Sequence, residues 1–162
     1  METAELPQKL IAVFGANPRP ATLLDMSNET RKRYAKEVDA LEAMDWEHGN
    51  PDDLDAFYEP NTFLSIVGYK YLIPKVFQFC QKWPEINKDL VEVMKVMPFL
   101  GDTDAFVNNF LGEERWLLWL FLEETHKLTG DCIFEDFGSE ATALQTKLIS
   151  AEASIGCIAE NR

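Results

Sequence analysis

The sequence predicts an all-α fold, a single compact bundle of about six or seven helices around two central apolar helices. Apolar residues make up 46% of the 162 residues, which is enough for one hydrophobic core. In most segments these residues recur at spacings of three and four, the period of an amphipathic helix. One short strand-like segment, Cys132-Ile-Phe, could be a strand or an irregular passage, but it cannot form a sheet alone.

The first central helix is predicted within the most apolar and aromatic stretch, Phe57 to Trp83. Pro60-Asn61-Thr62 provides a start signal, and Pro74, which lacks an amide proton, should end or bend the helix near Ile73 and open a second segment. Gly68 predicts a close approach of another helix. The expected core face consists of Phe63, Leu64, Val67, Tyr71 and Leu72.

Two helices are predicted before this stretch. The first runs from about Glu2 to Phe14 and ends at Gly15. Ser27 caps the second, from about Asn28 to Trp46. The charges of the second helix oppose its dipole, because basic residues lie near its start and acidic residues near its end.

Four helices are predicted after the central stretch. One begins at Pro84 and ends at Pro98, and the next, capped by Asp102 or Thr103, reaches Leu111. Glu113 to Leu128 is apolar on most sides and is the second central helix.

The last predicted helix follows Ser139 and spans about Glu140 to Ala153. Residues 154–162 are expected to be a loose tail. The sequence therefore predicts one helical domain over residues 1–153.

Net charge is −13, and most of it lies in two blocks. Residues 37–59 hold nine carboxylates and no Lys or Arg, and residues 102–162 hold twelve acidic against four basic residues. Such a field repels phosphate backbones and attracts basic surfaces, so we expect no direct binding of nucleic acid and a basic protein partner. An alternative interpretation, that the acidity serves solubility, remains open.

The first acidic block is the predicted partner-binding surface. On a helix, Asp39, Glu42 and Asp45 are three apart and share one side, and acidic residues of the following loop extend the patch. The same residues could simply be the polar side of a solvated helix and loop. The complete predicted surface consists of Glu37, Asp39, Glu42, Asp45, Asp52, Asp53 and Asp55.

Glu123-x-x-His126 has the spacing that helical di-iron proteins use, because positions three apart project from one face. Such sites need two of these pairs and two further carboxylates, and the second histidine, His48, follows Asp45 at a predicted helix end. The sequence has no nucleophile arrangement of triad type and no glycine-rich phosphate loop. We therefore expect no enzyme activity and no cofactor, with a carboxylate-bridged metal enzyme as an alternative.

The cysteines and the hydropathy pattern bear on location. Cys80, Cys132 and Cys157 form no Cys-x-x-Cys pair, so we expect reduced, mostly buried thiols. No segment has the pattern of a signal peptide, and the longest strongly apolar run, Trp116 to Leu122, is too short for a membrane span. The expectation is a soluble, cytoplasmic protein.

Several short segments form a pattern that covers roughly residues 6 to 128. It consists of Ile11-Ala-Val-Phe14, Pro18-x-Pro20, Trp46, Phe57 to Pro60, Tyr69-x-Tyr71-Leu72-x-Pro74, Glu114-Arg115 and Trp119-x-x-Leu122. This pattern resembles that of an uncharacterised family of small bacterial helical domains. The resemblance implies a compact helical domain and carries no activity.

In size, acidity and helical character the chain is also similar to bacterial immunity proteins, which neutralise a toxin. The hypothesis is therefore a non-enzymatic protein-binding module, an immunity protein that occludes a cognate toxin stoichiometrically. An inhibitor of a DNA-handling protein that mimics nucleic acid is the close alternative.

Overall fold

The computed structural model describes residues 5–45, 48, 62–83, 89–130 and 133–159, with the backbone alone for 89 and 151–159. The all-α fold is confirmed, and the described residues form eight α-helices and one 3-10 turn instead of six or seven helices. The elements are α1 (Leu6–Phe14), α2 (Asn28–Arg33), α3 (Ala35–Ala43), α6 (Ile66–Lys82), α7 (Asp89–Val96), η2 (Met97–Phe99), α8 (Thr103–Val107), α9 (Glu113–Leu128) and α10 (Ile133–Ala159).

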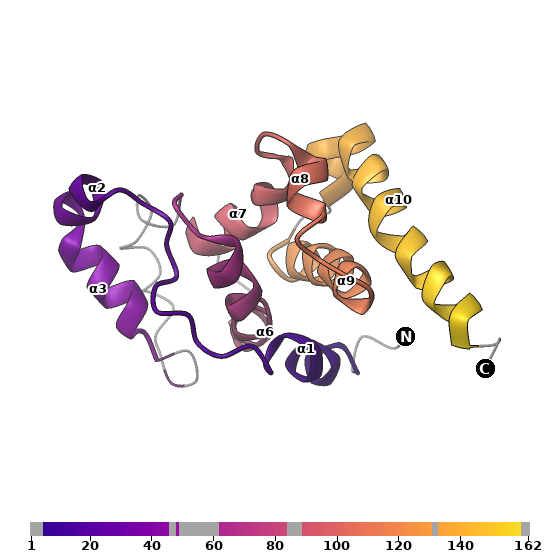
Figure 1. Cartoon of the computed structure of the whole chain (residues 1–162), viewed down its shortest axis with the longest axis horizontal. Helices are drawn as coiled ribbons and strands as arrows, with labels where there is room; N and C mark the ends of the chain where they lie inside the picture. The colour runs from indigo at the N-terminus through magenta and orange to yellow at the C-terminus, as the bar shows by residue number, and fades with distance from the viewer. Residues whose placement is uncertain (1–4, 46–47, 49–61, 84–88, 131–132, 160–162) are drawn as a thin grey trace.

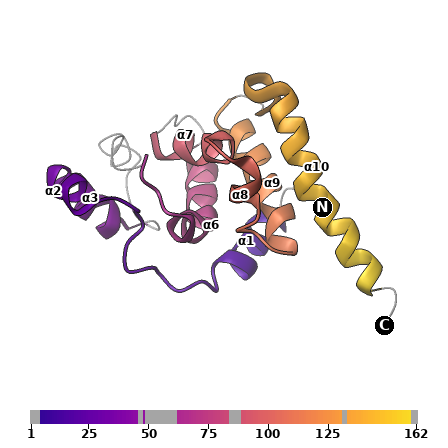
Figure 2. The ribbon, with the colours of Figure 1, turned by 45° about the horizontal axis from the view of Figure 1, so that its top comes forward.

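The helices are arranged in two parts (Figure 1). We call α2 and α3 the arm; among the described helices they contact chiefly each other, and they lie at one end of the molecule in both views (Figures 1 and 2). The remaining helices form the body, in which α6 and α9 pack against each other and both contact α1. α10 covers the other side of α9. In the part of the chain that is described, no helix has the length and apolar character of a membrane span.

Tyr69 lies at the centre of the body. Its side chain is completely buried, and its hydroxyl donates a 2.7 Å hydrogen bond to the carbonyl of Met94 on α7. Edge-to-face contacts join its ring to Phe106, Phe110 and Phe121, with centroids 5.3, 6.1 and 6.4 Å away. This one side chain therefore ties α6 to α7, α8 and α9, which supports the prediction of central apolar helices.

The central helix α6 begins later and continues further than predicted. Ser65 is its cap and accepts from the amide of Gly68, so Phe63 and Leu64 lie before the helix. The predicted helix end at Pro74 is wrong, because α6 continues through this residue to Lys82, and the alternative of a bend there stays a prediction. A proline inside a helix costs about 3 kcal/mol, and the burial of apolar side chains on both sides of it offsets that cost. These side chains are Leu72, Ile73, Val76 and Phe77.

Two residues of α6 contact different surroundings from those expected. Val67 was predicted in the core but is 60% exposed, and the next residues of α6, Gly68 and Tyr69, are buried in its place. Gly68 does permit a close approach, but the neighbour is an extended segment and not a helix. A Cβ at Gly68 would lie 2.1 Å from the carbonyl oxygen of Leu23.

The extended segment before the arm is bonded to the residues that precede α6. The amide and hydroxyl of Ser65 both donate to the carbonyl of Leu23 at 2.9 Å, and the amide of Asp25 donates to Phe63 at 2.7 Å. Leu24 and Leu64 form an isolated antiparallel bridge. These bonds close the base of the arm.

The helix predicted over Asn28 to Trp46 is two helices. Tyr34 interrupts it with φ −110° and ψ 29°, ending α2 and preceding α3. Arg31, Lys32 and Arg33 then lie in the last turn of α2, and Glu37 lies in the first turn of α3. The charges of α2 thus have the order that its dipole favours, whereas α3 still has Lys36 in its first turn and Glu42 in its last, so the break removes only part of the conflict. The structure shows α3 ending at Ala43, before Trp46.

Three helix ends differ from expectation in other parts of the chain. α1 begins at Leu6, and the predicted start at Glu2 lies outside the described residues. Pro98 lies inside the 3-10 turn that follows α7, and α8 ends at Val107. Asp102 caps α8 by accepting from two amides, as one of the two predicted caps.

In the C-terminal part, α9 has the predicted bounds, Glu113–Leu128. The last helix begins at Ile133, so the Cys132-Ile-Phe segment contributes two residues to α10 and is not a strand. Gly138, with φ 45° and ψ −111°, kinks α10 one residue before the predicted cap Ser139. The helix then reaches Ala159, beyond the predicted start of a loose tail at residue 154.

Candidate functional site

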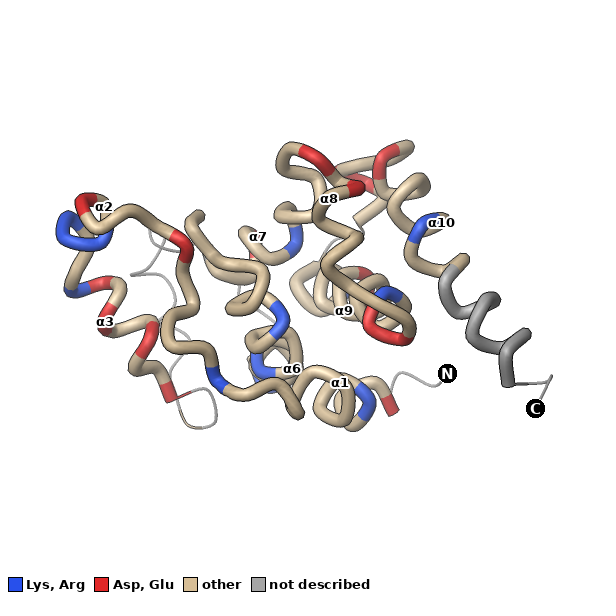
Figure 3. The backbone as a smooth tube through the Cα atoms, in the orientation of Figure 1, with Lys and Arg blue, Asp and Glu red and all other residues tan. Residues whose placement is uncertain are grey.

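The acidic residues of α3 lie on the arm, apart from the body (Figure 3). Asp39 is exposed, and Glu37 is half-buried on another side of α3. Asp45 follows the helix end, with 61% of its side chain exposed, and its Oδ2 lies 3.0 Å from Nδ1 of His48. Among the four predicted contact residues that the structure describes, Asp39 and Asp45 are therefore the most exposed to solvent.

Glu42 has a different role from its neighbours. Its carboxylate accepts from the hydroxyl of Thr22, from the amide of Leu23 at 3.3 Å and from Nη2 of Arg31 at 2.8 Å. Burial raises the pKa of this carboxyl group, but the hydrogen bonds from Thr22 and Arg31 and the charge of Arg31 outweigh burial, so that its pKa is lowered. Glu42 thus anchors α3 to α2 and to the extended segment.

Three of the seven predicted residues lie outside the described residues, namely Asp52, Asp53 and Asp55. Of the other four, Glu37, Asp39 and Glu42 lie on α3, and Asp45 lies two residues after the end of this helix. The structure separates them into outward-facing carboxylates and one internal anchor, a division that the spacing of three did not predict.

Glu123 and His126 lie on α9 at its contact with α10. His126 is 1% exposed, and its Nε2 lies 2.9 Å from Oδ2 of Asp136 on α10. Glu123 Oε1 lies 3.3 Å from Nζ of Lys127 on the same helix. Within the described residues, no group of three or more His, Cys, Asp or Glu side chains is close enough to hold a metal ion. The described residues therefore contain no set of metal ligands for the alternative hypothesis of a carboxylate-bridged metal enzyme.

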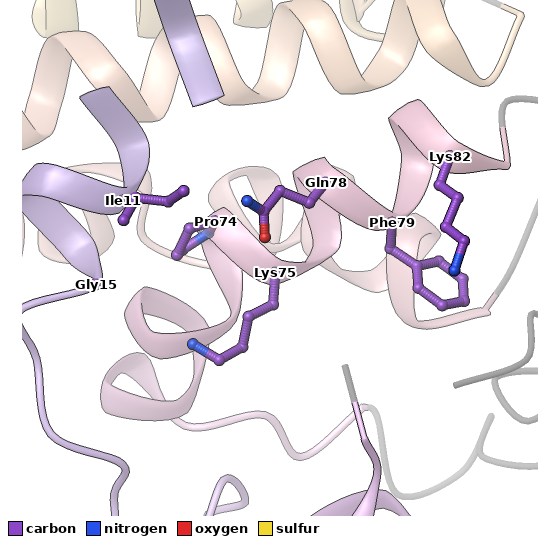
Figure 4. A pocket seen from close by; sticks show the side chains of 7 residues that line it. All are labelled: Ile11, Gly15, Pro74, Lys75, Gln78, Phe79 and Lys82. Carbon is purple, nitrogen blue, oxygen red and sulfur yellow. The ribbon is translucent and has the colours of Figure 1, made fainter. Parts of the chain in front are cut away.

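A pocket of about 580 Å³ that the sequence did not predict lies between α1 and α6. Two lysines of α6, Lys75 and Lys82, line it (Figure 4). One signal was present in the sequence, because residues 62–83 contain three lysines and no acidic residue. The sequence did not show that α1 packs against α6, and this packing brings Ile11 and Gly15 to the same hollow as the lysines.

Comparison of the chain with models of protein families, with curated proteins and with solved structures finds no match. The assignment of function therefore depends on the geometry and charge described above.

Proposed function

We propose that this protein is a non-enzymatic, cytoplasmic protein-binding module that binds a basic surface of its partner through the exposed acidic residues of the arm. The most concrete form is an immunity protein that occludes a cognate toxin stoichiometrically. Its contact residues would be Asp39 and Asp45, supported by Glu37 and extended by the acidic residues after His48.

The observation that supports this proposal is the fixed orientation of α3. The Arg31–Glu42 ion pair, together with the Thr22 hydroxyl and the Leu23 amide, joins both arm helices to the segment that leads into the body. A surface that is ordered before binding loses less conformational entropy when its partner arrives. The anchor therefore favours a binding surface over a merely solvated helix.

The charges of the arm also match this role. Residues 37–59 hold nine carboxylates and no Lys or Arg, whereas Arg31, Lys32, Arg33 and Lys36 precede them, so a basic partner would meet the acidic field along the stretch that follows Lys36. Such a field increases the rate of encounter, and the effect falls as salt is added. Binding should therefore weaken between low and moderate ionic strength.

The experiment uses a double charge reversal, Asp39→Lys with Asp45→Lys, in a pull-down from lysate of the source cells, followed by titration of the purified partner. Glu135→Lys with Glu140→Lys is the matched control, because both acidic residues are exposed on α10 and the net charge changes equally. We expect the control to bind like the wild type and the arm variant to bind at least tenfold more weakly.

Equal binding by the arm variant would show that the acidic face is not the contact surface. If the partner is a DNA-handling protein whose nucleic acid competes with this chain, the mechanism is mimicry of nucleic acid at the same face. Glu42 should not be used as a contact variant, because its replacement would release the arm.

A further inference from the structure

The pocket between α1 and α6 combines an apolar floor with unneutralised positive charge. The described residues that line it come from the end of α1 and the second half of α6 (Figure 4), namely Ile11, Gly15, Pro74, Lys75, Gln78, Phe79 and Lys82. A volume of about 580 Å³ lies within the range of about 300–1,000 Å³ that small-molecule sites occupy. The hollow is thus large enough for a ligand of moderate size.

The two lysines rest on aromatic rings. Nζ of Lys75 lies 3.8 Å from the ring centroid of Tyr71 and 3.4 Å from the Tyr71 carbonyl, and Nζ of Lys82 lies 5.6 Å from the ring centroid of Trp83. An aromatic face attracts a cation but carries no net charge that would neutralise it. Neither ring thus supplies a negative charge that would balance the lysine beside it.

Several other basic side chains of the body form ion pairs with carboxylates. On the same helix, Nζ of Lys70 lies 2.6 Å from Glu114, and elsewhere Lys127 contacts two glutamates. No such ion pair joins Lys75, Lys82 or Arg19 to a carboxylate of the described residues. The pocket is therefore a local basic site on a strongly acidic protein.

The environment of Lys75 supports this description. Burial lowers the pKa of its ammonium group, and the nearby charge of Arg19 lowers it further. An anion bound beside Lys75 would reduce the repulsion between the two cations. The repulsion between Lys75 and Arg19 is present without ligand, and its relief therefore favours the binding of an anion beside Lys75.

The apolar part of the pocket restricts the kind of anion. Ile11 is 45% exposed, although its neighbours Leu10 and Phe14 are fully buried, and it borders the pocket together with Pro74 and Phe79. Lys75 and Lys82 are two helical turns apart, or about 10 Å along the axis. A complementary ligand therefore has an apolar body of similar length and an acidic group at one end.

We infer that this pocket binds a small amphiphilic carboxylate, an aliphatic or aromatic acid whose apolar body contacts Ile11, Pro74 and Phe79 and whose carboxylate pairs with Lys75 or Lys82. The inference is independent of the proposed partner of the arm. It concerns a surface of the body that the acidic residues of α3 do not touch.

The experiment titrates the whole protein by calorimetry with three probes, decanoate, butanoate and decyltrimethylammonium. We expect decanoate to bind at least tenfold more tightly than butanoate, because the apolar floor adds to the charge interaction, and decyltrimethylammonium not to bind. Loss of protein peaks from Ile11, Lys75 and Phe79 in a two-dimensional amide NMR spectrum would place decanoate in the pocket.

The decisive variant is Lys75→Gln with Lys82→Gln, because both changes keep long polar side chains and remove the two charges. Lys32→Gln with Arg33→Gln is the matched control on exposed α2. We expect at least tenfold weaker binding of decanoate by the pocket variant and unchanged binding by the control. Equal affinity of all three proteins, equal binding of both decyl probes, or no binding of decanoate by the wild type would overturn the inference.

Discussion

Gly68 is the position where helix propensity and tertiary packing predict opposite effects of the same substitution. Replacing glycine by alanine inside a helix ordinarily stabilises a protein by about 1 kcal/mol. In Gly68→Ala, however, the new Cβ would lie 2.1, 2.8 and 2.9 Å from the backbone O, C and Cα of Leu23. No side-chain rotation can relieve a contact between two backbones, so α6 and the extended segment must separate.

The size of the effect follows from the bonds that such a separation breaks. Three hydrogen bonds hold the two segments together, two from Ser65 to Leu23 and one from Asp25 to Phe63. At about 1 kcal/mol each they amount to roughly 3 kcal/mol. After subtraction of the gain in helix propensity, the expected loss in the free energy of unfolding is about 2 kcal/mol.

The assay is equilibrium unfolding in urea, followed by tryptophan fluorescence and far-ultraviolet circular dichroism. Val67→Ala is the control, because this neighbouring side chain is 60% exposed and its truncation should change stability by less than about 0.5 kcal/mol. A Gly68→Ala protein that is as stable as the wild type, or more so, would refute the close approach of α6 to Leu23.

Two further predictions concern buried polar groups. Glu42→Gln should destabilise the protein at pH 7. Because the pKa of Glu42 is lowered from 4.5 in the folded state, the difference in stability from the wild type should shrink as pH falls below that value. Unfolding in urea at pH 7 and pH 3 measures this difference, and a difference that grows in acid would contradict the prediction. Tyr69→Phe should cost about 1–3 kcal/mol, because the buried carbonyl of Met94 loses its donor. The control is Tyr71→Phe, which keeps the ring beneath Lys75, and equal thermal stability of the two variants would be evidence against the central role of Tyr69.

Local signals predicted much of the fold from the sequence. The bounds of α9 were correct because a glycine stands at each end and the intervening residues are apolar on most sides. The break at Tyr34 was missed because the apolar period continues across it. The reversed charge order was a partial signal, because Arg31, Lys32 and Arg33 lie favourably once α2 ends at Arg33, although α3 still ends with Glu42 in its last turn.

Tertiary contacts account for what the sequence did not predict. Pro74 stays inside α6 because neighbouring apolar side chains are buried, and burial depends on helices distant in the chain. The acidic character of α3 could be predicted from composition. The role of Glu42 could not, because its partner Thr22 is twenty residues earlier and reaches it only when the extended segment folds back.

The closed base of the arm has a consequence for how this protein can be altered. The chain enters the arm after Asp25 and returns at Phe63, and these two residues share a backbone hydrogen bond of 2.7 Å. The two ends of the segment that carries the arm therefore lie side by side, so one short stretch of backbone fixes where the arm leaves the body. Val38, Leu41 and Met44 nevertheless belong to the same buried apolar cluster as Leu64 and Tyr69. A different acidic segment grafted between Asp25 and Phe63 would therefore keep the fold of the body only if it supplied apolar side chains in place of these three.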